Sequence, residues 1–147
     1  MRDHPAFHQD FEVHGGDFAR AGEVSCLIKN LLKELGIGAA IVRRVAIASF
    51  EAEMNVIMYA FRGMVGLTVT PSQIRIVVDD QGPGIPDIEQ AMAEGFSTAT
   101  TEMRERGFGA GMGLPNIKKN ADTFRLISEV GSGTRLEITI AVNGQRA

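Results

Sequence analysis

The sequence predicts a protein of the α/β class. Strand-like patterns of apolar residues recur in several segments, and helix-like spacings of three and four residues recur between them. With 44% hydrophobic residues in a chain of 147, most of the apolar surface can be buried in one core. We therefore expect a single domain covering residues 1–147.

The first half of the chain is predicted to hold an edge strand and two helices. Apolar and polar residues alternate from Phe7 to Val13 before a Gly-Gly pair, as in a half-buried strand. Asp17 can cap a first helix that ends at Gly36, and a second helix is expected from about residue 39 to residue 61. The predicted buried stripes are Val24, Ile28, Leu31 and Leu35 in the first helix, and Ile47, Phe50, Met54, Ile57 and Phe61 in the second.

The second half is predicted to hold two hairpins and a further helix. The strands are expected at 64–69 and 74–79, around a Thr-Pro-Ser-Gln turn, and at 124–130 and 134–142, around a Gly-Ser-Gly turn. The strand at 74–79 is apolar enough to be central in a sheet. Residues 88–94 are expected to form a short helix, 95–106 a mobile loop, and 114–121 another helix.

Composition argues against several kinds of partner. The net charge is −3 and the basic residues are not massed in a block, so no nucleic-acid partner is expected. No apolar run approaches the roughly 20 residues that span a bilayer, so no membrane association is expected. The polar N-terminus and the single Cys26 indicate a cytoplasmic protein. The three histidines lie far from Cys26 in sequence, which is not a zinc pattern.

Two glycine-containing stretches indicate a ligand site. Between Gly107 and Gly113 every second residue is glycine, which lets backbone N–H groups approach a polyanion. Upstream, Asp80 ends an apolar run and begins the turn Asp-Gln-Gly-Pro-Gly84. Either stretch alone is more often a flexible connection or an ordinary turn. Together they favour a nucleotide site, although neither has the spacing of the Walker A or dinucleotide motifs.

Glu51 and Asn55 form a candidate catalytic pair on the second helix. They are four residues apart, so they lie on one line of the helix, at the rim of the predicted core. Asn55 can supply an oxygen to Mg²⁺, and Glu51 can act as a base in phosphoryl transfer. A hydrogen bond between the two side chains along the helix is an equally open alternative. Glu53 is about 200° from Glu51 and is predicted to face solvent.

These residues resemble the nucleotide-binding motifs of the GHKL ATPases, the superfamily of gyrase, MutL and histidine kinases. Glu51-Ala-Glu-Met-Asn55 resembles the N box, Asp80-Gln-Gly-Pro-Gly84 the G1 box and Gly107–Gly113 the G2 box, in the correct order. Residues 79–87 and 94–98 resemble the bacterial anti-sigma-factor and serine-kinase branch of this superfamily. Within the branch, the resemblance is strongest to RsbT-like members and next strongest to RsbW-like members. The resemblance implies a Bergerat fold. This is a two-layer α/β sandwich with a mixed, mostly antiparallel sheet, helices on one face and an ATP lid at about 95–113.

The resemblance also implies roles for individual residues. Asp80 would accept a hydrogen bond from the adenine amino group, Asn55 would ligate Mg²⁺, and Glu51 would be the catalytic base. Thr134 resembles the threonine that supports the adenine-side aspartate. The further ATP-binding residues that it implies are Gly82, Gly84, Ile85, Gly107, Gly109, Ala110, Gly111, Met112, Gly113 and Leu114.

In function, the resemblance implies a protein serine/threonine kinase that uses ATP and Mg²⁺. Its substrate would be a STAS-domain antagonist in a sigma-factor regulatory pathway based on partner switching. Two alternatives stay open: an anti-sigma factor that sequesters a sigma factor with ATP as a conformational ligand, and an activator of a PP2C-type phosphatase. All three share one ATP site, and the sequence leaves the partner, the signal and homodimer formation open.

Overall fold

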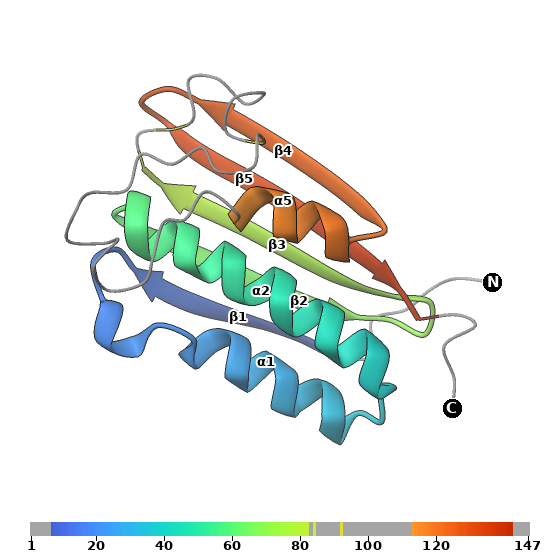
Figure 1. Ribbon diagram of the computed structural model, residues 1–147. Coiled ribbons are helices and arrows are strands. Elements are labelled where there is room, and N and C mark those ends of the chain that lie inside the picture. Colours follow the sequence, from blue (N-terminus) through green and yellow to red (C-terminus); the bar gives the residue numbers. More distant parts are fainter. Residues whose placement is uncertain (1–6, 83, 85–91, 93–112, 143–147) are drawn as a thin grey trace.

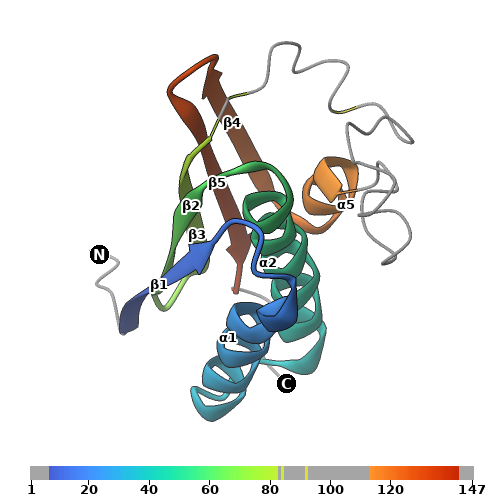
Figure 2. The ribbon, with the colours of Figure 1, turned by 90° about the vertical axis from the view of Figure 1, so that its left-hand side faces the viewer.

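The protein is a two-layer α/β sandwich, seen here in a computed structural model that describes residues 7–82, 84, 92 and 113–142. Figures 1 and 2 show the helices packed on one face of a five-stranded sheet. The strands are β1 (Phe7–His14), β2 (Arg62–Val69), β3 (Gln73–Gln81), β4 (Thr123–Glu129) and β5 (Gly133–Ala141). The helices are the 3-10 turn η1 (Phe18–Arg20), α1 (Glu23–Glu34), α2 (Ala39–Tyr59) and α5 (Gly113–Asn120).

The sheet has the strand order β1-β2-β3-β5-β4. Every pairing within the described residues is antiparallel, where the resemblance implied a mixed, mostly antiparallel sheet. The predicted hairpins are confirmed as β2–β3 and β4–β5, and β1 is an edge strand as predicted. β3 is central because its apolar side chains meet partners on both neighbouring strands.

The core lies between the sheet and the helices. Strands contribute alternate residues to it, as the period of two requires, and α2 contributes side chains from more than one side because sheet and helices both pack on it. Its fully buried apolar side chains include Ile28, Leu32, Ile41, Val45, Val56, Leu67, Ile74, Ile76, Ile117, Ile138 and Ile140. Among the helices of the described residues, none is long and apolar enough to cross a membrane.

The predicted face of α1 is wrong by part of a turn. Val24 and Ile28 are buried as predicted, but Leu32 is fully buried whereas Leu35 is 43% exposed. Asp17 does not cap this helix: it precedes the short turn η1 without a side-chain cap, and the N-cap of α1 is Gly22. The C-terminal end is as expected, because the next residue after Leu35 is a glycine with φ of +79°.

The predicted C-terminal end of α2 is also wrong. Met54 and Ile57 are buried as predicted, but Phe50 is 36% exposed and Phe61 is 81% exposed. Phe61 lies outside the helix because its backbone N–H donates to the carbonyl of Gln81 at 2.8 Å, and so belongs to the start of the β2–β3 pairing. The helical spacing of apolar residues continues two residues past the end of α2. The backbone at Phe61 nevertheless hydrogen-bonds to β3 instead of continuing the helix.

Glu53 is buried, although its helical position predicts exposure. Its side chain is 1% exposed, and its two oxygens accept hydrogen bonds from the backbone N–H groups of Val24 (3.2 Å) and Ser25 (3.0 Å). These donors begin α1, whose N-cap Gly22 has no side chain to satisfy them. Glu53 therefore caps α1 from the neighbouring helix, where the positive end of the helix dipole favours a carboxylate.

Replacing Glu53 with alanine should lower the free energy of unfolding by about 3 kcal/mol, because two buried N–H groups lose a charged acceptor. Urea denaturation followed by circular dichroism measures the change. Glu51→Ala is the matched control on the same helix, where the carboxylate is half-buried rather than enclosed, and it should cost less than about 1 kcal/mol. Equal losses in the two variants would show that Glu53 is not the cap that the contacts indicate.

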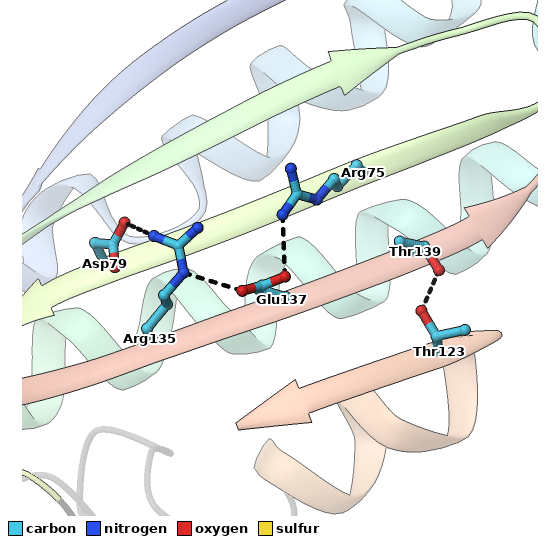
Figure 3. A network of polar contacts seen from close by, with 6 residues as sticks. All are labelled: Arg75, Asp79, Thr123, Arg135, Glu137 and Thr139. Carbon is cyan, nitrogen blue, oxygen red and sulfur yellow. Dashed lines mark hydrogen bonds and ion pairs between the residues drawn. The ribbon is translucent and has the colours of Figure 1, made fainter. Parts of the chain in front are cut away.

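The sheet face opposite the helices carries a network of ion pairs (Figure 3). Arg135 Nη1 donates to Asp79 Oδ2 at 2.7 Å and its Nε donates to Glu137 Oε2 at 3.0 Å, while Arg75 Nη2 donates to Glu137 Oε1 at 3.0 Å. Two of these pairs, Asp79–Arg135 and Arg75–Glu137, join β3 to β5 in a register that places Asp79 opposite Arg135. Because the side chains are partly exposed, each pair adds little stability. Their main effect is to give the Asp79 carboxylate, the neighbour of Asp80 in the chain, a positively charged partner.

Candidate functional site

The contact between α2 and α5 brings together three residues that the sequence predicts to share a site. Glu51 and Asn55 are half-buried on α2, and Gly113 begins α5. A Cβ atom at Gly113 would lie 3.3 Å from Asn55 Oδ1 and 3.7 Å from Glu51 Oε2. The absence of a side chain there lets the start of α5 approach both oxygens. A carboxylate, an amide oxygen and the first turn of a helix thus converge, and such groups can hold a polyphosphate and its cation.

Asn116 belongs to this group, and the sequence analysis missed it. Its Nδ2 donates to Glu51 Oε2 at 3.4 Å from the next turn of α5. The signal that could have found it is its spacing from Gly113, since residues three apart on a helix share one face. Leu114, the next predicted site residue, is half-buried and packs against the core.

Asp80 is held at the carboxyl end of β3 by the β4–β5 hairpin. Its Oδ1 accepts the backbone N–H of Thr134 at 3.0 Å. Thr134 therefore contacts Asp80 through its main chain, while its hydroxyl lies 2.9 Å from the hydroxyl of Ser128. Gly133 is needed at this point: its φ is +115°, and a Cβ would lie 2.1 Å from the Asp80 carbonyl oxygen.

Burial raises the pKa of the Asp80 carboxyl above its ordinary value of 3.8. Desolvation is the largest effect on this pKa. The hydrogen bond from Thr134 lowers the pKa by less, and the nearby charge of Asp79 raises it further. A half-buried carboxylate that is more costly to ionise in the folded protein suits a ligand that supplies a hydrogen-bond donor.

The two glycines after Asp80 have packing roles that the sequence analysis did not foresee. A Cβ at Gly82 would lie 3.0 Å from Cα of Ala60, just past the end of α2, and 3.3 Å from Asp80 Oδ1. Gly84 has φ of +78°, and a Cβ there would lie 2.4 Å from the carbonyl oxygen of Glu129. Gly82 thus fits closely against the end of α2, and Gly84 fits closely against the β4–β5 hairpin.

The two groups of residues lie along the second half of α2. Gly82 contacts Ala60, and Asn55 is five residues earlier, about 7.5 Å along the helix axis. The Asp80 group and the Glu51 group therefore both lie beside the C-terminal half of α2. The predicted residues Ile85, Gly107, Gly109, Ala110, Gly111 and Met112 lie outside the described residues, as do the predicted helix at 88–94 and loop at 95–106 except Met92.

The donor set at Asn55 and Glu51 suits magnesium rather than a metal held by the protein alone. In the described part of the chain, no three His, Cys, Asp or Glu side chains are grouped to hold an ion. Magnesium takes oxygen ligands and commonly uses one or two protein oxygens together with phosphates and water. Asn55 Oδ1 next to the glycine that begins α5 fits this mode.

Comparison with known proteins places the chain in a family. Residues 24–144 match the model of the histidine kinase-, DNA gyrase B- and HSP90-like ATPases, and the chain belongs to this family. It is 37% identical to serine/threonine-protein kinase RsbT of Bacillus subtilis over 113 residues, which are 74% of this chain and 79% of RsbT. The resemblance to GHKL ATPases and to the RsbT type is confirmed.

Other relatives are anti-sigma factors. The chain is 32% identical over 101 residues to anti-sigma F factor of Caldanaerobacter subterraneus, which covers 65% of this chain and 67% of that protein. A solved structure of the RsbU and RsbW domains of a Mycobacterium tuberculosis protein matches 89% of this chain with a TM-score of 0.57 and 14% identity. This chain spans 31% of that one, and the match supports the two-layer fold alone.

Proposed function

We propose that this protein is an ATP-dependent serine/threonine protein kinase of a bacterial sigma-factor regulatory pathway, and that its substrate is a STAS-domain antagonist protein. The observation that carries the proposal is the convergence of Glu51, Asn55 and Gly113 at the α2–α5 contact. The 37% identity to a serine/threonine-protein kinase supports the same reading.

The adenine end of ATP would be recognised by Asp80. The N–H of Thr134 fixes one carboxylate oxygen, Oδ1, and leaves Oδ2 to accept from the adenine amino group. Hydrogen bonds to a half-buried carboxylate are strong because one partner is charged. The close packing of Gly82 on Ala60 fixes the position of the backbone that follows Asp80.

The phosphate end would lie between α2 and the start of α5. Asn55 would hold Mg²⁺, which when bound neutralises charge on the phosphates of ATP. Glu51 would accept the proton of a serine or threonine hydroxyl of the partner as that oxygen bonds to the γ-phosphorus. The bond from the γ-phosphorus to the bridging oxygen breaks, ADP leaves, and the phosphorylated partner is released.

A second candidate is an anti-sigma factor, which the 32% identity to an anti-sigma F factor favours. In that case ATP would set the conformation that binds a sigma factor. An activator of a PP2C-type phosphatase is a further alternative with the same ATP site. The three differ in what the protein does to its partner, so an assay with partner proteins distinguishes them.

The test incubates the purified protein with labelled ATP, Mg²⁺ and the STAS proteins, sigma factors and PP2C-type phosphatases encoded by the same genome. The proposal expects one STAS protein to gain one phosphate on a serine or threonine, read by intact-mass spectrometry. Stable, ATP-dependent capture of a sigma factor with no labelled STAS protein would favour the anti-sigma role and overturn the proposed kinase role.

A further inference from the structure

We propose that Asn116 is a positioning residue for Glu51, holding the carboxylate in the orientation in which it serves as the base. This inference rests on the proposed kinase function and adds a residue that the sequence motifs do not contain. It starts from the contact between the Asn116 amide Nδ2 and Glu51 Oε2 at 3.4 Å.

The contact occupies one oxygen of the carboxylate. Glu51 Oε2 is also the oxygen that lies nearest to the start of α5, 3.7 Å from the position of a Gly113 Cβ. An amide on this oxygen leaves Oε1 for the partner's hydroxyl proton. A distance of 3.4 Å is long for a hydrogen bond, and such contacts often shorten when substrate assembles at the site.

Asn116 is itself held in place by contacts at the other end of α5. Asn120 Nδ2 donates to the Asn116 carbonyl at 2.8 Å, and Arg44 Nε on α2 donates to the Asn120 carbonyl at 3.1 Å. Arg44 Nη2 also donates to Asp122 Oδ1 at 2.9 Å. The apolar side of the helix is anchored by Ile117, which is fully buried. α2 and α5 are therefore joined at both ends.

Asp122 strengthens this anchor because its carboxylate pairs with Arg44 and accepts the backbone N–H of Ala141. The backbone N–H of Ala141, and then Arg44, hold the pKa of the Asp122 carboxyl below its usual value. These contacts fix the C-terminal end of α5 against α2 and so help to keep Asn116 beside Glu51, and a base must stay within a narrow geometry for proton transfer.

Asn116→Ala should lower the rate of phosphotransfer about 10-fold at saturating ATP, while the affinity for ATP stays nearly unchanged. Asn30→Ala is the matched control, since it removes the same amide from the exposed face of α1, away from Glu51, and it should transfer phosphate at close to the wild-type rate. Asn116→Gln, whose longer side chain still carries a donating amide, should restore part of the rate.

A double-mutant cycle distinguishes positioning from a general effect on structure. If Asn116 acts through Glu51, then Asn116→Ala added to Glu51→Gln should cause no further loss of rate. A further 10-fold loss in the double variant would overturn the proposal, as would an unchanged rate in Asn116→Ala alone.

A second readout does not depend on activity. The shifts of the urea midpoint caused by Glu51→Ala and Asn116→Ala should be non-additive, because residues in contact couple. Additive shifts would overturn the contact. If no STAS partner is phosphorylated by the wild type, the proposed function fails and the positioning role fails with it, while non-additive midpoints would still establish the contact between the two side chains.

Discussion

Glu51→Gln is expected to slow phosphate transfer to the partner by about 10²–10⁴-fold while leaving the affinity for ATP nearly unchanged. Glutamine keeps the size and helix propensity of Glu51 and can still accept a hydrogen bond from Asn116, but it cannot take a proton. The loss therefore falls on the chemical step rather than on nucleotide binding.

Two measurements separate these effects. Labelled transfer at saturating ATP gives the rate, and calorimetry gives the affinity. Glu34→Gln, at the exposed end of α1, is the control and should transfer phosphate normally. Unchanged transfer in Glu51→Gln would remove Glu51 from the base role, and lost ATP binding would show that its role is structural.

Asp80→Asn is expected to weaken ATP binding about 10- to 100-fold, the cost of losing a hydrogen bond to a charged group. In the variant, the side-chain oxygen keeps the N–H of Thr134, and the new amide group then faces the adenine amino group. The amide N–H₂ of the variant and the adenine amino group are both donors, so the hydrogen bond that the Asp80 carboxylate would accept is lost.

The same substitution should stabilise the protein without ligand. Because the pKa of Asp80 is raised on folding, its favourable contribution is complete below the ordinary value of 3.8 and is lost as pH rises through the folded pKa. At neutral pH the carboxylate is therefore a cost that asparagine removes. The urea midpoint of Asp80→Asn should exceed that of the wild type at pH 7, and the difference should shrink as pH falls towards 3.8.

Asp79→Asn is the matched control for this prediction. Asp79 is the neighbouring aspartate, but it is exposed on the open face of the sheet and pairs with Arg135. Its replacement should leave ATP affinity nearly unchanged. An equal loss of affinity in the two variants would show that the effect comes from charge at the strand end and not from a hydrogen bond to adenine.

Much of this fold could be predicted from the sequence because strands are marked by local patterns of apolar residues, such as alternation with polar ones. All five strands were expected within two residues of their bounds, and the central place of β3 followed from its apolar run. Of the site, Glu51, Asn55, Asp80 and Gly113 lie in motifs with distinctive spacing. The structure brings Glu51 and Asn55 together with Gly113 from the other end of the chain.

What the sequence could not supply depends on contacts between distant segments. Glu53 reads as a solvent-facing residue because its role is set by N–H groups of α1, which lie 28 and 29 residues away. Asn116 carries no motif, and its partner is 65 residues away. Such roles become visible only when the helices are placed in space.

The central claim is that one ATP binds with Mg²⁺ between Asp80 and the Glu51–Asn55 pair. Calorimetric titration with ATP, in Mg²⁺ and again with excess chelator, tests it most directly. We expect one ATP per chain in Mg²⁺, with affinity that falls on chelation and falls in Asp80→Asn. No heat of binding and no thermal stabilisation by ATP in Mg²⁺ would contradict the claim.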